Sequence, residues 1–154
     1  MLKLFKNITG KSESAPDDKT LKKDINLATC ALLIELANAD GKFSQQEKNN
    51  IVSVFKTKYS IPDEDIDELI KSSEEALKNS IDIWQFTNRI NQNYTLDEKL
   101  RVIETVWEVA YSDGKLDQHE DYLAHKIASL LRLNHRQLID AKLKVLHSRD
   151  NSAS

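Results

Sequence analysis

The sequence contains one stretch twice, as IELANADGKFSQQE at residues 34–47 and WEVAYSDGKLDQHE at residues 107–120. With position 34 aligned to position 107, the two copies share these identities: Glu35/Glu108, Ala37/Ala110, Asp40/Asp113, Gly41/Gly114, Lys42/Lys115, Gln45/Gln118 and Glu47/Glu120. Repetition at a fixed spacing constrains architecture before it says anything about chemistry. We therefore expect two halves related by approximate two-fold symmetry.

The length and composition favour one helical domain. A chain of 154 residues has enough surface to bury, since a domain of about 150 residues buries roughly two-thirds of what its unfolded chain exposes. Only three Gly and two Pro occur, while Leu, Ile, Ala, Lys, Glu and Gln abound, which favours helices over the tight turns of a β-protein. We expect an all-α, single-domain bundle of about seven helices.

The charge is modest overall but unevenly spread. A net charge of −3 argues against a nucleic-acid binder, which usually carries a strong basic excess. Residues 62–78 hold seven acids against Lys71 and Lys78, whereas residues 126–149 hold six Lys and Arg against Asp140 alone. Such patches can face each other or a protein partner. We expect a protein partner, which the sequence does not identify, and the sequence leaves the oligomeric state open.

The chain shows no membrane span and no secretory signal. The first residues lack an apolar core of about 7–15 residues, and no later segment approaches the roughly 20 apolar residues of a span. Cys30, the single cysteine, lies in an apolar run and is expected to be a buried thiol in a reducing compartment. These features predict a cytoplasmic protein.

Three segments are expected along the chain. Residues 1–19 form a flexible or short amphipathic N-terminal segment, residues 20–148 the helical domain, and residues 149–154 a disordered tail. Residues 1–8 place four apolar side chains among lysines, which allows a weak contact with a membrane surface. Because two turns are too short to be a stable helix alone, docking on the core or fraying is the favoured alternative.

Apolar spacing and capping residues set the expected helices. The first covers residues 20–39 and ends at Asp40-Gly41, where Gly suits a left-handed cap. The second helix is expected to start at the capping box Ser44/Glu47 and to end near Tyr59, and the third has Pro62 in its first turn. Ser80 is expected to cap a fourth helix over residues 81–94, and the box Thr95/Glu98 starts a fifth that ends at Asp113-Gly114. Asp117 with Glu120 caps a sixth helix through Leu131, and Asn134 caps a seventh. Residues 81–94 are expected to bridge the halves, with Trp84, Phe86, Trp107 and Tyr111 in the core or between helices.

These residues carry a family resemblance. The long apolar helix, the pattern Ala-Asp-Gly-Lys with a later Glu, the bridge near Trp84-Gln85-Phe86-Thr87 and the second copy Val-Ala-Tyr-Ser-Asp-Gly-Lys-Leu-Asp resemble the TerB-like family, named for tellurite resistance. The resemblance covers about residues 20–147 and is closest to small stand-alone bacterial members. It implies an all-helical fold, a divalent-metal site of acidic residues and a role in tellurite or other stress responses, without an established enzymatic activity. The family is also related to a domain of membrane-anchored DnaJ-like co-chaperones, but the His-Pro-Asp signature of the J-domain is absent here.

The acidic residues of the repeat have two interpretations. Each copy brings three carboxylates to one helix corner, and such hard oxygen ligands suit Ca²⁺, Mg²⁺ or Mn²⁺. The candidate ligands are, in order, Asp40, Glu47, Asp113 and Glu120, then Glu35 and Glu108. If the copies face each other, all six converge. Alternatively, Glu47 and Glu120 only cap helices, Asp40 and Asp113 only end them, and Lys42 and Lys115 neutralise Glu35 and Glu108.

No catalytic signature accompanies this cluster. The chain has no P-loop, dinucleotide fingerprint or G-x-S-x-G elbow. The histidines (His119, His125, His135 and His147) lack metal-ligand spacing and are expected at the surface. The sequence therefore predicts a non-enzymatic protein that binds a divalent cation. The alternative is a metal-independent helical interaction module that works through the acidic third or the basic seventh helix.

Overall fold

The computed structural model describes residues 18–39, 41, 43–112, 114 and 116–153. These residues form seven helices and no strand, which confirms the all-α prediction. The helices are α2 (Asp18–Ala37), α3 (Gln45–Thr57), α4 (Asp63–Lys78), α5 (Trp84–Asn93), α6 (Leu96–Ala110), α7 (Gln118–Leu130) and α8 (His135–Ala153). The expected N-terminal segment lies almost wholly outside the described residues. Helix α8 extends into residues 149–154, for which the sequence predicted a disordered tail.

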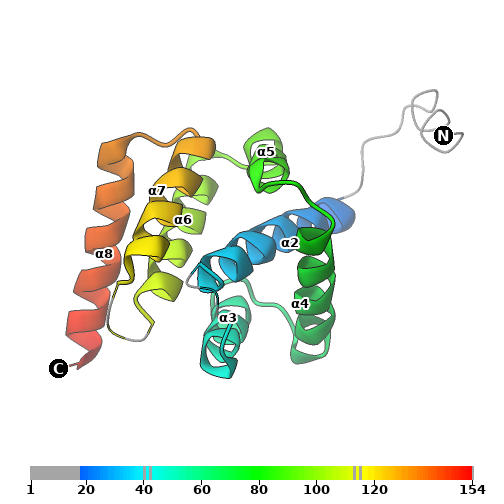
Figure 1. The fold of residues 1–154 in the computed structure, drawn as a ribbon, viewed down its shortest axis with the longest axis horizontal. Helices are drawn as coiled ribbons and strands as arrows, with labels where there is room; N and C mark the ends of the chain where they lie inside the picture. The colour runs from blue at the N-terminus through cyan, green and yellow to red at the C-terminus, as the bar shows by residue number, and fades with distance from the viewer. Residues whose placement is uncertain (1–17, 40, 42, 113, 115, 154) are drawn as a thin grey trace, which may run out of the picture.

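The helices pack as two groups that contact each other directly through α2 and α6, and α5 contacts both groups. Helix α4 packs along α2, and α8 packs along α6 in the same way. Helix α5 lies above the centre in Figure 1, in contact with both α2 and α7. Helices α3 and α7 start at Gln45 and Gln118, which are equivalent positions of the sequence repeat, and their last residues are equivalent under the same alignment.

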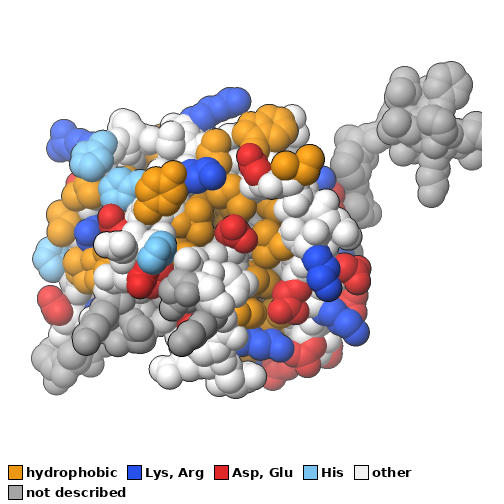
Figure 2. Space-filling view, viewed as in Figure 1, with side chains coloured by type: hydrophobic (Ala, Val, Ile, Leu, Met, Phe, Trp, Pro, Cys, Tyr) orange, Lys and Arg blue, Asp and Glu red, His pale blue; other side chains and the backbone are white. Residues whose placement is uncertain are grey.

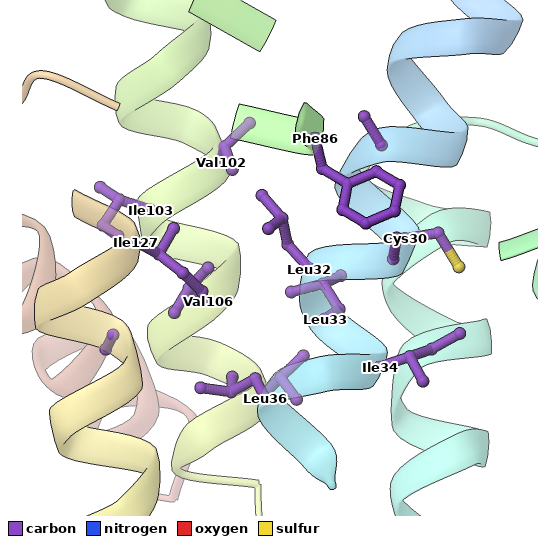
Figure 3. Close-up of a cluster of buried hydrophobic side chains, with 14 of the residues drawn as sticks. Cys30, Leu32, Leu33, Ile34, Leu36, Phe86, Val102, Ile103, Val106 and Ile127 are labelled. Carbon is purple, nitrogen blue, oxygen red and sulfur yellow. The ribbon is translucent and has the colours of Figure 1, made fainter. Parts of the chain in front are cut away.

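The core lies where α2 meets α6. Leu32, Leu33 and Leu36 of α2 are fully buried, as are Val102 and Val106 of α6. Figure 3 shows these side chains in the space between the two helices, with Phe86 of α5 above them and Ile127 of α7 on the α6 side. Burial on this scale drives folding, since each buried aliphatic side chain contributes about 1.5–3 kcal/mol.

Local capping explains most of the helix starts. Ser44 and Glu47 form the predicted capping box of α3, and Thr95 and Glu98 form that of α6. At the start of α8, the Asn134 N–H donates to Gln137 Oε1, and the Gln137 N–H donates to Asn134 Oδ1, each at 2.8 Å. These reciprocal bonds satisfy backbone groups that a helix start leaves without partners.

The bridge departs from the sequence prediction in two ways. The Ser80 hydroxyl donates to the Leu77 carbonyl at the end of α4, so Ser80 does not cap α5, which begins only at Trp84. Trp84 is 56% exposed, so its expected place in the core or between helices was wrong. Its neighbours Ile83 and Phe86 are buried, and their burial turns the indole toward solvent. The expectation of a buried Cys30 was confirmed.

Helices long and apolar enough to cross a membrane are absent from the part of the chain that the structure describes.

Candidate functional site

Both acidic motifs form a corner of the same backbone geometry. Gly41 follows α2 with φ of +88°, and Gly114 follows α6 with φ of +87°. Each glycine precedes a helix whose third residue is a motif glutamate, Glu47 in α3 and Glu120 in α7. The remaining motif residues, Asp40, Lys42, Asp113 and Lys115, lie outside the described residues. The structure therefore places four of the six candidate ligands: Glu35, Glu47, Glu108 and Glu120.

At the first corner, Glu47 caps its own helix. Its Oε1 atom accepts the Ser44 N–H at 2.9 Å, and the Glu47 N–H donates to Ser44 Oγ at 3.1 Å. The capping interpretation of Glu47 is thus confirmed. Capping uses one of two carboxylate oxygens, and an ionised carboxylate has about four acceptor positions. The second oxygen can still serve as a cation ligand.

The second corner is built differently. The N-cap residue Asp117 accepts the His119 N–H at 2.7 Å, and Asp117 Oδ1 lies 3.0 Å from His119 Nδ1. The backbone N–H of His119 is the main reason that the pKa of Asp117 is lowered, because that bond stabilises the ionised carboxylate. Glu120 is buried, with 9% of its surface exposed, and it interacts with other groups of the protein.

The third pair of candidates, Glu35 and Glu108, lies on α2 and α6. Glu108 Oε1 lies 2.7 Å from Lys58 Nζ, at the C-terminal cap of α3. This cation belongs to the other half of the chain, which is why local patterns did not find it. Glu35 is partly buried on α2. Hence Glu108 has a protein cation, as the non-metal interpretation requires, although the cation is Lys58.

Two cavities lie beside these corners. One, of about 830 Å³, lies among α3, α6 and α8, and Lys58, Glu104, Glu108 and Lys144 are among its lining residues. Lys144 Nζ lies 3.2 Å from Glu104 Oε2, so ion pairs reach α6 from both α3 and α8. The other cavity, of about 500 Å³, lies between the end of α2 and the start of α7.

The lining of that second cavity is less charged. Its residues are Ala39, Gln118, His119, Tyr122 and Leu123. In the alignment of the repeat, Ala39 corresponds to Ser112 and Leu123 to Asn50, and both counterparts line the larger cavity. The two cavities thus share two corresponding positions of the repeat, but one carries charged pairs and the other an exposed tyrosine.

The histidines lie mostly at the surface, as expected. His135 and His147 are exposed, and the His119 side chain is 61% exposed. His125 is partly buried, with its ring edge-on to Trp107 at a centroid distance of 6.2 Å. Within the residues that the structure describes, no three His, Cys, Asp or Glu side chains form a group that could hold a metal ion.

The fold and corners define a class: a small all-helical protein with two Asp-Gly-Lys corners, each followed by a helix bearing a glutamate at its third position. Residues 26–143 match the model of the tellurite resistance protein TerB family, so the chain belongs to the TerB family. The comparisons with curated proteins and with solved structures gave no significant match.

Proposed function

We propose that this TerB-family protein is a non-enzymatic protein of a tellurite or other stress response that binds a divalent cation at its acidic corners. The observation that carries the proposal is the pairing of Gly41 and Gly114, whose φ angles differ by one degree and which each lead into a helix bearing a motif glutamate. Each corner also carries an aspartate immediately before the glycine. The donor set is thus two carboxylates per corner.

The chemistry of this donor set fits a hard cation. Carboxylate oxygens are the ligands that Ca²⁺, Mg²⁺ and Mn²⁺ prefer, and these ions accept backbone carbonyl oxygens as well. Asp40 and Glu47 would hold an ion at the first corner, and Asp113 and Glu120 at the second. Glu120 favours the second corner, because the attraction between a carboxylate and a cation is stronger where water is largely excluded. A bound ion would supply positive charge that ties each corner to its following helix.

Glu35 and Glu108 contribute less to this proposal. Lys58 already neutralises Glu108 across the contact between α3 and α6. A metal site that recruits Glu108 would have to replace that ion pair. We therefore place Glu108 outside the direct ligands and retain Asp40, Glu47, Asp113 and Glu120 as the first candidates, with Glu35 after them.

Thermal unfolding of chelator-treated protein tests the proposal, with Ca²⁺, Mg²⁺, Mn²⁺ and Zn²⁺ titrated separately. An ion that binds only the folded state raises the melting temperature in a saturable way. We expect this rise in the wild type and its loss in Asp40→Asn/Asp113→Asn. The matched control, Asp97→Asn/Asp140→Asn, removes the same number of carboxylates away from the corners and should retain the rise. Absence of a rise with every ion would overturn the metal proposal.

The second candidate function is a metal-independent protein-interaction module. The capping role of Glu47 and the ion pair of Glu108 favour it, because both carboxylates have structural partners without a metal. Its interaction surfaces would be the acidic α4 or the basic α8. This function predicts binding of a protein partner that persists in chelator and is lost when α4 or α8 charges are reversed. Binding that requires a divalent ion would contradict it.

A further inference from the structure

Two large apolar side chains face solvent where α4 connects to α5. Ile81 is fully exposed, and Trp84, three residues later, is 56% exposed. Hydrophobic side chains are visible over α5 in Figure 2. Single exposed apolar residues need no explanation, but two at one connection form a small surface on which another apolar group can pack. We call Ile81 and Trp84 the elbow surface.

The elbow surface is rigidly presented. Ile83 and Phe86 are 5% and 4% exposed and anchor the start of α5 in the core. The Asp82 carboxylate accepts the Trp84 N–H and so fixes the first turn. Since Ile81 and Trp84 flank an anchored residue, their exposure results from the fold rather than from a loose end.

The stretch that carries the elbow surface, between positions 74 and 84, holds three acids and one lysine. Glu74 and Glu75 lie exposed near the C-terminal end of α4, and the exposed Asp82 stands between the two apolar residues. Lys78 is the one basic residue between positions 74 and 84. The chemistry that fits this place is therefore an apolar segment that carries positive charge.

The chain itself supplies such a segment. Residues 1–8 contain Leu2, Leu4, Phe5 and Ile8 with Lys3 and Lys6, and the first acid of the chain is Glu13. No other stretch outside the described residues combines apolar and basic side chains in this way. Segment 1–8 thus matches the elbow surface in both hydrophobicity and charge.

The point at which the described chain begins places this segment within reach. The Ser73 hydroxyl lies 3.4 Å from the Leu27 carbonyl oxygen, so the C-terminal half of α4 contacts α2. Figure 1 shows the N-terminal end of α2 beside the C-terminal end of α4 and the connection to α5. Nine residues separate Ile8 from Asp18, and they span up to ~30 Å when extended. Helix α4, with 16 residues, is about 24 Å long.

We propose that segment 1–8 of this chain docks on the elbow surface, with its apolar side chains against Ile81 and Trp84 and its lysines facing the acids of α4 and Asp82. The occupant is the protein's own N-terminal segment, and the contact is intramolecular. The proposal does not depend on a metal at the acidic corners.

Tryptophan fluorescence gives a direct test, because Trp107 is fully buried and Trp84 is the accessible indole. We expect Leu4→Asp/Phe5→Asp to raise acrylamide quenching about twofold, since undocking exposes an indole face that apolar contacts covered. The matched control Thr9→Asp/Ser12→Asp adds the same charge beyond the segment and should quench like wild type. The Trp84→Phe substitution should abolish the difference between the Leu4→Asp/Phe5→Asp background and the wild type.

Three results would overturn the proposal. The first is equal quenching of wild type and Leu4→Asp/Phe5→Asp. The second is protection of Trp84 that grows with protein concentration, because this would assign the contact to a second copy. The third is protection that occurs only with phosphatidylglycerol vesicles, because this would assign segment 1–8 to a lipid surface.

Discussion

Lys58 Nζ lies 2.7 Å from Glu108 Oε1, and this ion pair joins the end of α3 to the core helix α6. The sequence repeat allows this ion pair to be compared between the two halves of the chain. Glu108 corresponds to Glu35, but the position that corresponds to Lys58 is occupied by Leu131, which is fully buried. The two halves therefore share the glutamate and differ in what surrounds it.

Removal of Lys58 should cost more than removal of a fully exposed partner. The Lys58 and Glu108 side chains are 28% and 37% exposed, so part of the charge of Glu108 is shielded from water. We expect Lys58→Met to lower the free energy of unfolding by about 1 kcal/mol, the upper end for such pairs. Urea unfolding measures the effect, and Lys56→Met, whose partner Asp63 is 73% exposed, should change it by a few tenths at most. Equal effects of the two substitutions would contradict the assigned role.

The glycine corners make a second prediction. A Cβ built on Gly41 or Gly114 meets no atom within 4 Å, so alanine introduces no clash at either place. The cost is then the positive φ alone, about 1–2 kcal/mol for a residue with a Cβ. We expect Gly41→Ala and Gly114→Ala to lose similar free energies of unfolding in urea. The corresponding asparagine variants should lose less, because asparagine tolerates positive φ better. A loss confined to one corner would show that the corners differ in more than sequence position.

Helix starts were predictable because their determinants are local. Ser44, Thr95 and Asn134 each find a partner three residues later, a distance that sequence spacing reveals. Ser80 offered a similar local signal, but burial of Ile83 decided where α5 starts, and this burial depends on helices distant in sequence. The exposure of Trp84 was missed for the same reason.

The candidate site was predictable only in part. The repeat identified two corners, and the structure gives both the same glycine conformation. The partner of Glu108 was not predictable, since a salt bridge between the two halves of the chain leaves no local pattern. The metal itself stays a prediction, because Asp40 and Asp113 lie outside the described residues.

Asp117 predicts how the free energy of unfolding depends on pH in acid. Its pKa is lowered from 3.8, chiefly by the His119 N–H, so below that value the unfolded state binds more protons than the folded state. Its contribution is therefore complete above the unfolded pKa and is lost as pH falls through the folded pKa. We expect Asp117→Asn to flatten the fall in unfolding free energy below about pH 4. Asn134→Ala, which removes a non-titrating cap, should lower stability without flattening that fall.

Cys30 predicts how the free energy of unfolding depends on pH in alkali. The thiol is fully buried within the core shown in Figure 3, and burial raises its pKa from 9.0 to about 12. The folded state thus holds its proton between these values while the unfolded state loses it. The contribution of the Cys30 thiol to the free energy of unfolding is therefore fully present below pH 9 and declines as pH rises toward 12. Urea unfolding between about pH 8 and 10 should show this decline in wild type, and a shallower decline in Cys30→Ala.

Alkylation of Cys30 by iodoacetamide tests the same burial kinetically. If the thiol reacts only after unfolding, the rate must follow the population of unfolded protein. Leu32→Ala removes a fully buried side chain and should cost ~2–5 kcal/mol, so it should speed alkylation by well over tenfold. Arg136→Ala, at a side chain that is 90% exposed, should leave the rate close to that of wild type. A rate that is the same in wild type and Leu32→Ala would mean that the folded protein admits the reagent to Cys30, and the core between α2 and its neighbours would then be less closed than its burial implies.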